Sequence, residues 1–143
     1  MQDLLEHETV PVQANFVDDR ETRRRYRVLW TPTVMILDED GEARQTIVPA
    51  SLPPDEFVPV VLAALGRAYV ALKRPDDALR CFDRVADEHP AALAAPEALD
   101  WRGVARHAKK DDEGMKSSWS ELWNDHPESF WGRAVTFANE QVR

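Results

Sequence analysis

The spacing of large and small side chains between residues 62 and 90 constrains this chain more than any other feature. Leu65, Tyr69 and Phe82 are large, whereas Gly66 and Ala78 are small. Residues three and four apart share one face of a helix, so these intervals predict two helices. The small residues let the helices approach closely, and the large ones fill the seam between them. The segment is therefore expected to fold as a pair of antiparallel helices.

Prolines mark the limits of this helix pair. Pro75-Asp76 is predicted to turn the chain between the helices, and Pro90 to end the second one. The combined spacing resembles a tetratricopeptide repeat (TPR), and the one departure among these positions is Leu62, where that family has Trp. The resemblance implies a helical array that binds protein partners.

A second, degenerate copy of the pattern follows 37 residues later. Gly66 recurs as Gly103, Phe82 as Trp119 and Pro90 as Pro127, with three residues inserted. Arg106 and Met115 replace the Tyr and Ala of the repeat. We therefore expect two repeats followed by a helix that caps the last apolar face.

The apolar periodicity places these helices at 55–73, 96–109, 112–125 and 128–141. Pro59 lies inside the first of these ranges, so we expect a kink or a restart there. On the last helix, Phe130, Ala134 and Phe137 are predicted to share the apolar face.

The first 50 residues have a different pattern. Residues 9–17 alternate apolar and polar side chains and predict a strand, and Asp18 and Asp19 are suited to cap a short helix over 20–27. Thr31-Pro32 precedes a short apolar strand over 34–37. Asp40-Gly41 then supplies a turn into a returning strand over 43–48.

This order resembles the second half of a thioredoxin domain. The resemblance rests on six residues spaced between positions 26 and 41: Tyr26, Val28, Pro32, Thr33, Asp38 and Gly41. It implies a cis Thr31-Pro32 bond bordering an active site. The central strand and the Cys-x-x-Cys helix of that family do not precede these residues. Three explanations stay open: a truncated chain, a strand supplied by an oligomer, and a rearranged sheet.

The expected fold class is therefore α+β. A partial, thioredoxin-like sheet with helices is expected over residues 1–53, and an all-α, TPR-like helical array with a capping helix over residues 54–143. The resemblance in layout is to bacterial proteins that join a thioredoxin domain to TPR repeats. Those proteins act as chaperone-like proteins and are linked to cell redox homeostasis.

Composition limits the possible functions. A net charge of −8 argues against a nucleic-acid partner, because phosphate contacts need basic side chains. No apolar run reaches the roughly 18 residues that cross a bilayer, so no membrane partner is expected. Cys81 is the single cysteine, which excludes an internal dithiol and favours a reducing, cytoplasmic setting. We expect no cofactor.

Few side chains suggest chemistry, and we predict no catalytic residue. Cys81 is expected to pack as a small apolar residue rather than to act as a reactive thiol. The four histidines are too scattered for a metal site, and the arginine-rich segment 20–27 is expected to be a solvated helix face. The expected partner-binding residues fall into two groups: Trp30, Thr31 and Pro32 around the proline, and Arg67, Trp101 and His107 on the first helices of the repeats.

Two functions follow from these features. The first is a non-catalytic, chaperone-like interaction protein that binds polypeptide clients, with a possible homo-oligomer completing the sheet. The alternative is a truncated thiol–disulfide oxidoreductase whose Cys-x-x-Cys lies upstream of Met1. With only one cysteine, the chain in this form cannot exchange a dithiol.

Overall fold

The computed structural model describes residues 9–48 and 52–141, which fall into two compact units. The first unit is Met1–Leu52 and the second is Pro53–Arg143.

A short helix opens the described part of the first unit. Helix α2 spans Arg20–Arg25, and the Asp19 side chain caps it by accepting a hydrogen bond from the Thr22 N–H at 3.0 Å. The helix ends there because the chain turns through Arg27, whose φ is +51°. No side chain of α2 is buried, which confirms that its arginines form a solvated face. Arg23 lies over the Phe16 ring, 5.0 Å from its centroid.

A β-hairpin follows. Strand β1 (Val34–Leu37) pairs antiparallel with β2 (Ala43–Ile47), with Val34 opposite Ile47 and a bulge between Ile36 and Leu37. The Gly41 N–H donates to the Asp38 carbonyl at 3.0 Å, and the φ of Gly41 is +74°, as a turn glycine allows. The Thr31–Pro32 peptide bond is cis, as the resemblance implied. The predicted hairpin is therefore confirmed.

The predicted strand over residues 9–17 is wrong. This segment is irregular until a turn at residues 16–18, and β1 pairs with β2 alone within the described residues. A strand needs a partner for its backbone groups, and the alternating side chains have no face to cover. Val10 and Val12 are accordingly 88% and 87% exposed. None of the residues 9–48 is fully buried.

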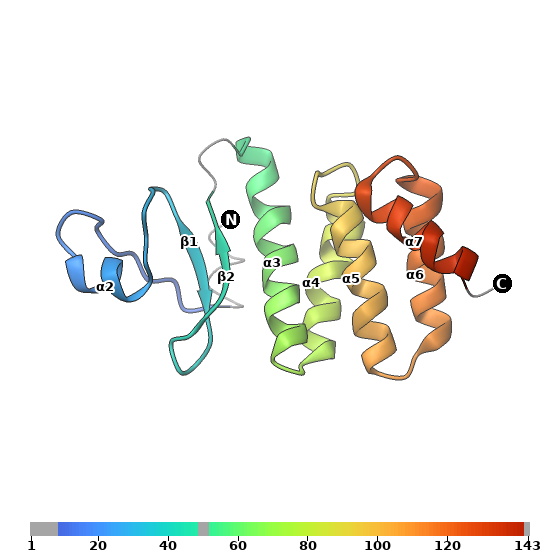
Figure 1. Ribbon diagram of the computed structural model, residues 1–143, viewed down its shortest axis with the longest axis horizontal. Helices are drawn as coiled ribbons and strands as arrows, with labels where there is room; N and C mark the ends of the chain where they lie inside the picture. Colours follow the sequence, from blue (N-terminus) through green and yellow to red (C-terminus); the bar gives the residue numbers. More distant parts are fainter. Residues whose placement is uncertain (1–8, 49–51, 142–143) are drawn as a thin grey trace. The chain divides into compact units, whose positions relative to one another are not determined.

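The second unit is an antiparallel helical array (Figure 1). A short 3₁₀ turn, η1 (Pro54–Glu56), leads into it. The helices are α3 (Phe57–Ala71), α4 (Pro75–Glu88), α5 (Ala95–Ala108), α6 (Asp112–Asp125) and α7 (Phe130–Gln141). Helix α5 lies at the centre, because it contacts α3, α4, α6 and α7.

The two helix pairs share the packing that the sequence predicted. A methyl group at Gly66 would overlap the ring of Phe82, and one at Gly103 would overlap the indole of Trp119. Phe82 itself is completely buried. Both glycines therefore let α3 approach α4, and α5 approach α6, to the distance that these aromatic rings set. His89 and His126 occupy the C-cap positions of α4 and α6.

Two prolines behave differently from the prediction. Pro59 causes no break, because α3 begins at Phe57 and the proline falls in the first turn, where its missing N–H has no helical partner to lose. Pro75 does not form the turn between α3 and α4. It begins α4, and the turn is made by residues 72–74, with Lys73 at φ +58°.

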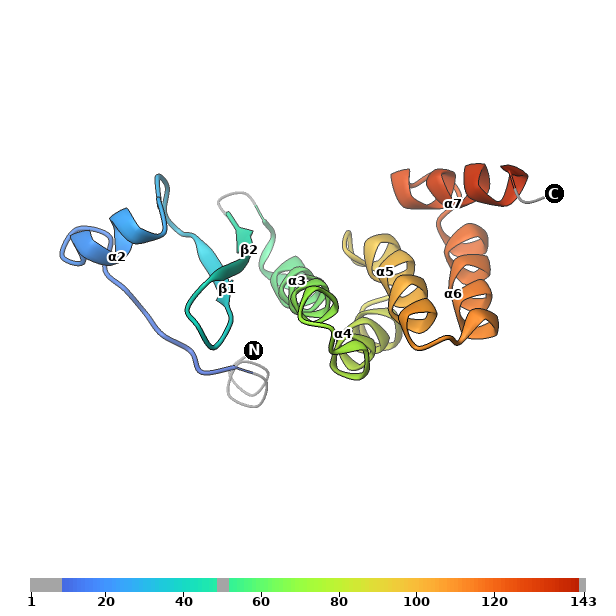
Figure 2. The ribbon, with the colours of Figure 1, turned by 60° about the horizontal axis from the view of Figure 1, so that its bottom comes forward.

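The last helix turns a different face inward than predicted. Phe130 is 71% exposed and Ala134 is exposed, while the side chain of Phe137 lies outside the described residues. The buried residue is Val135, which joins Leu99 and Leu122 in a small core that Trp131 helps to cover. Figure 2 shows why: α7 crosses α6 instead of extending the array alongside it. None of the described helices has both the length and the apolar character needed to span a membrane.

Candidate protein-binding face

Helices α3 and α5 carry three of the six side chains predicted to bind a partner. Arg67 of α3 forms an ion pair with Glu97 of α5, with Nη1 and Oε1 2.8 Å apart. Trp101 lies one helical turn after Glu97, so it occupies the same side of α5. The structure therefore places Arg67 and Trp101 beside one interhelical contact. We call this surface, around Arg67, Glu97, Asp100 and Trp101, the α3/α5 face.

Two donors of this face lack partners. The Arg67 Nε and the Trp101 Nε1 are both buried, and neither has a hydrogen-bond partner among the described residues. Buried polar atoms are nearly always hydrogen-bonded, so two orphaned donors in one seam are unusual. Each of these atoms is therefore a donor that a ligand could satisfy.

Asp100 is the most perturbed acid in the second unit. Burial raises the pKa of Asp100 to about 6, and the negative charge of Glu97, three residues earlier on α5, adds to this shift. Its carboxylate has no ion pair or hydrogen bond among the described residues, although its backbone carbonyl accepts one from Trp119 Nε1 at 3.3 Å. Arg67 is already paired with Glu97, so the face has an uncompensated carboxylate.

His107 does not join this group. It lies six residues after Trp101, or roughly 9 Å along the axis of α5. Its imidazole is exposed and pairs with Asp112 of α6 at 3.1 Å. The side chain therefore belongs to the end of the α5–α6 pair.

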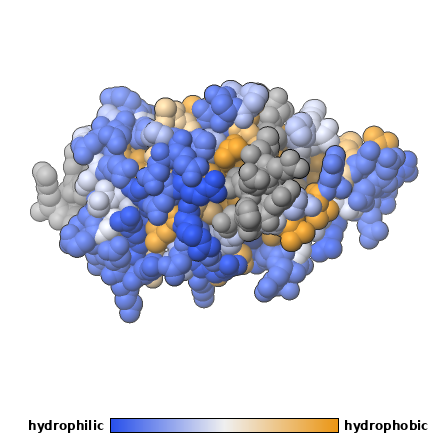
Figure 3. Space-filling model, turned by 180° about the vertical axis from the view of Figure 1, so that it is seen from behind, coloured by the Kyte–Doolittle hydropathy of each residue, from blue (hydrophilic) through white to orange (hydrophobic). Residues whose placement is uncertain are grey.

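The other predicted group lies in the first unit. Trp30 is 73% exposed, and Thr31 and Pro32 are exposed too. Thr33 donates a hydrogen bond to the Trp30 carbonyl at 2.6 Å, which holds this loop before β1. Leu29, beside Trp30, is 79% exposed, so the loop presents an apolar surface. Figure 3 shows one face of the molecule, where polar side chains, in blue, surround scattered apolar areas, in orange.

Arg102 was not among the residues predicted from the sequence. Its side chain is only 8% exposed and lies among α4, α5 and α6, donating to Ser118 Oγ at 3.2 Å and to the Glu121 carboxylate. Asp83 of α4 lies 3.7 Å away. The signal was present, because the 37-residue offset aligns Arg102 with the core residue Leu65. The same offset aligns Glu97 and Asp100 with Val60 and Ala63.

The histidines and Cys81 were also considered from the sequence. The described residues contain no cluster of three His, Cys, Asp or Glu side chains that could hold a metal ion. Cys81 is 2% exposed on α4, in agreement with a packing role.

Comparison with known proteins supports the repeat alone. The tetratricopeptide repeat family matches residues 64–92, which span the second half of α3, all of α4 and the start of the following linker. No curated protein matches the sequence. The chain thus contains a TPR repeat within a helical array, and such repeats typically bind protein partners.

Proposed function

We propose that this protein is a non-catalytic interaction protein that binds polypeptide clients through its α3/α5 face. The observation that carries the proposal is the uncompensated, partly buried carboxylate of Asp100 beside the Arg67–Glu97 ion pair. A buried charge without a partner costs stability, so a ligand that supplies the partner gains free energy.

The charge of the face defines the client. Arg67 and Glu97 neutralise each other, which leaves Asp100 as the net charge of the site. A lysine or arginine of an unfolded or extended segment would compensate it. The partly buried indole of Trp101 would cover neighbouring apolar side chains of the same segment. The client class is therefore a basic polypeptide with apolar residues.

The first unit is proposed to be the second half of a thioredoxin-like domain. The order of α2, the Pro32 loop, β1, the Asp40-Gly41 turn and β2 supports this assignment. The exposed residues Leu29, Trp30 and Pro32 would then form a second contact for the client. A chaperone-like role follows from combining the two surfaces. Thiol–disulfide exchange has less support, because the one cysteine of this chain is buried.

Binding of an unfolded basic polypeptide tests the main proposal. Reduced, carbamidomethylated lysozyme is basic and cannot refold, and its binding to the full chain is measured by titration calorimetry. We expect binding by the wild-type chain, weakened roughly tenfold in Asp100→Lys, which reverses the charge of the site. Asp87→Lys is the matched control, since Asp87 is an exposed residue of α4.

The outcomes separate the possibilities. Equal binding by Asp100→Lys and Asp87→Lys would remove Asp100 from the site. Absence of binding by the wild-type chain would overturn the proposal. Because Asp100→Lys could unfold the chain, Asp100→Asn is measured in parallel and circular dichroism is recorded for each variant.

A further inference from the structure

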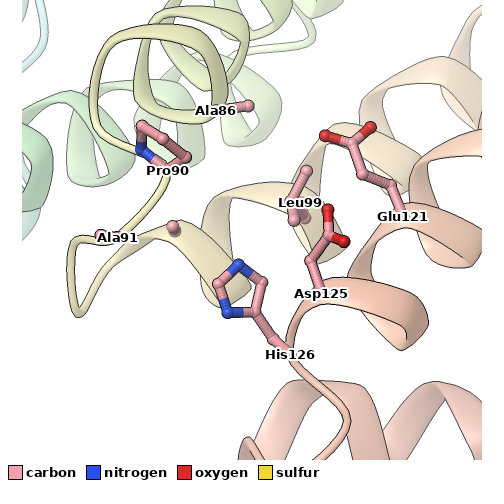
Figure 4. Close-up of a pocket in the computed structure, with 8 residues that line it drawn as sticks. Ala86, Pro90, Ala91, Leu99, Glu121, Asp125 and His126 are labelled. Atoms are coloured by element: carbon pink, nitrogen blue, oxygen red, sulfur yellow. The ribbon is translucent and has the colours of Figure 1, made fainter.

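A cavity lies in the second unit, and none of the residues that define the α3/α5 face lines it. It has a volume of about 270 Å³ and opens between the end of α4, the linker over residues 89–94, the start of α5 and the end of α6 (Figure 4). Its apolar lining is made of small side chains and one leucine: Ala86, Pro90, Ala91, Ala95 and Leu99. Leu99 also belongs to the core with Leu122 and Val135, so the floor of the cavity is fixed by packing.

The linker that forms one wall is the place where the repeat has been lengthened. The intervals from Gly66 to Phe82 and from Gly103 to Trp119 are equal, and the same holds for Phe82 to Pro90 and Trp119 to Pro127. The three inserted residues therefore follow Pro90. Insertions in repeat proteins occur in loops of one face, which is often a binding face.

Hydrogen bonds hold this linker in place. The Leu93 N–H donates to Glu56 Oε2 at 2.9 Å, which ties the linker to η1. The Ala92 N–H donates to the His89 carbonyl at 3.0 Å, and the Ala95 N–H donates to the Ala92 carbonyl at the same distance. The wall is therefore formed before any ligand binds. Leu93 itself is 73% exposed beside it.

The opposite wall is acidic. Glu121 and Asp125 lie four residues apart on α6, hence on one face of the helix, and both line the cavity. Arg102 holds Glu121 from the side of α5. Asp125 has no ion pair or hydrogen bond with any residue that the structure describes. Figure 4 shows both carboxylates on the α6 side of the cavity, across from Ala91.

The size and charge of the cavity select its occupant. Ligand pockets for whole small molecules begin at roughly 300 Å³, so this cavity suits one long side chain. An aliphatic stem would lie on the alanines and Leu99, and a cationic head would reach the carboxylates. A planar guanidinium can contact Asp125 and the Glu121 oxygen that Arg102 does not contact, which an ammonium does less well.

We propose that this cavity, lined by Ala91, Leu99, Glu121 and Asp125, is a second docking site that takes an arginine side chain of a partner polypeptide. It shares α5 with the α3/α5 face, but its lining includes none of the four residues that define that face. It therefore stands or falls separately from the function proposed above.

Peptide titration with the full chain tests the site. The probe is acetyl-Ala-Leu-Arg-Leu-Ala-amide, followed by amide chemical shifts in ¹H–¹⁵N spectra. The expected result is a set of shifts concentrated at residues 91–95 and 125–126. Replacing the arginine of the peptide by citrulline, which keeps its shape and removes its charge, should weaken binding roughly tenfold.

Variants of the protein sharpen the test. Asp125→Asn should weaken the arginine peptide by a similar factor, whereas Asp87→Asn, an exposed change on α4 outside the cavity, should leave binding unchanged. Both residues are exposed, so neither change threatens folding.

Three outcomes would overturn the proposal. The first is the absence of shifts, or shifts confined to the α3/α5 face, which would support the other site only. The second is equal binding of the arginine and citrulline peptides. The third is equal binding of agmatine and the peptide, which would make the cavity a small-cation site instead of a docking site for polypeptides.

Discussion

Asp100 of α5 combines a cost in stability with the binding role proposed above. Its carboxylate is partly buried and lacks a partner among the described residues, and Glu97 is one turn away on the same helix. A carboxylate in this position is harder to ionise than one in water. The folded state therefore holds a proton on Asp100 at pH values where the unfolded chain has lost it.

The sign of the resulting pH dependence follows from this shift. The pKa of Asp100 is raised from its usual value of 3.8 to about 6. Its contribution to stability is complete below pH 4 and is lost as the pH rises through 6. Asp100→Asn should therefore match the wild type near pH 4 and exceed it above pH 6. After allowance for its partial exposure, the gain should be about 1 kcal/mol.

Urea unfolding at several pH values between 4 and 8 measures this difference. Asp87→Asn is the control, because that carboxylate is exposed. A constant offset between Asp100→Asn and the wild type across the whole range would mean that the carboxylate is fully solvated in the folded state.

Helix pairs are the elements that the sequence predicts best. The bounds of α5 and α6 agree with the prediction to within a residue. The reason is that Gly103, Trp119 and Pro127 repeat the spacing found in the first helix pair. Local signals also predicted α2 and the hairpin, through the Asp19 cap and the Asp40-Gly41 turn. The local pattern failed where a strand needs a neighbouring strand to pair with. Residues 9–17 alternate like a strand but pair with no strand among the described residues.

The candidate sites divide in the same way. Arg67 and Trp101 could be assigned to one surface, because TPR first helices lie side by side. Three other features depend on how the helices dock. They are the ion pair of Arg67 with Glu97, the unpaired carboxylate of Asp100 and the cavity between α4, α5 and α6. An exposed lysine or glutamate gives no sequence signal that marks it as part of a site. A charged residue aligned with the core residue Leu65 does give one, so Arg102 could have been recognised by comparing the two copies of the repeat pattern.

The contact between Gly66 and Phe82 gives a prediction at this scale. Gly66→Ala places a methyl group inside the Phe82 ring, so the ring or α4 must move, and the free energy of unfolding should fall by about 1–3 kcal/mol. The Phe82→Leu change should itself destabilise the chain, because it removes buried ring atoms. In the double variant the methyl group occupies part of the vacated space, so the two losses should be less than additive.

Thermal and urea unfolding of the four proteins complete this double-mutant cycle. Gly132→Ala is a poor control, because a methyl group there would overlap a backbone carbonyl. Ala71→Gly, at the exposed end of α3, tests instead the helix-propensity difference between the same two residue types. Additive losses in the cycle would show that the ring does not set the distance between α3 and α4.

At the scale of the whole molecule, the two units differ in what holds them together. The second unit buries Leu62, Phe82 and Leu122 completely. The described residues of the first unit form a two-stranded hairpin and a short helix, with no fully buried side chain between 9 and 48. A hairpin of two strands is marginal in water, and independent stability takes a third strand or a packed helix. Residues 9–48 are therefore expected to need apolar contacts beyond those they make with one another.

Separating the units should expose this difference. A fragment of residues 53–143 should unfold in one cooperative transition, with a urea midpoint close to that of the full chain, because its core is its own. A fragment of residues 1–52 should show no cooperative transition. Circular dichroism and tryptophan fluorescence follow both fragments, and Trp30 reports on the first alone. Cooperative unfolding of the 1–52 fragment as a monomer would contradict the argument. The same transition appearing only at high protein concentration would instead identify a second copy as the source of the missing contacts.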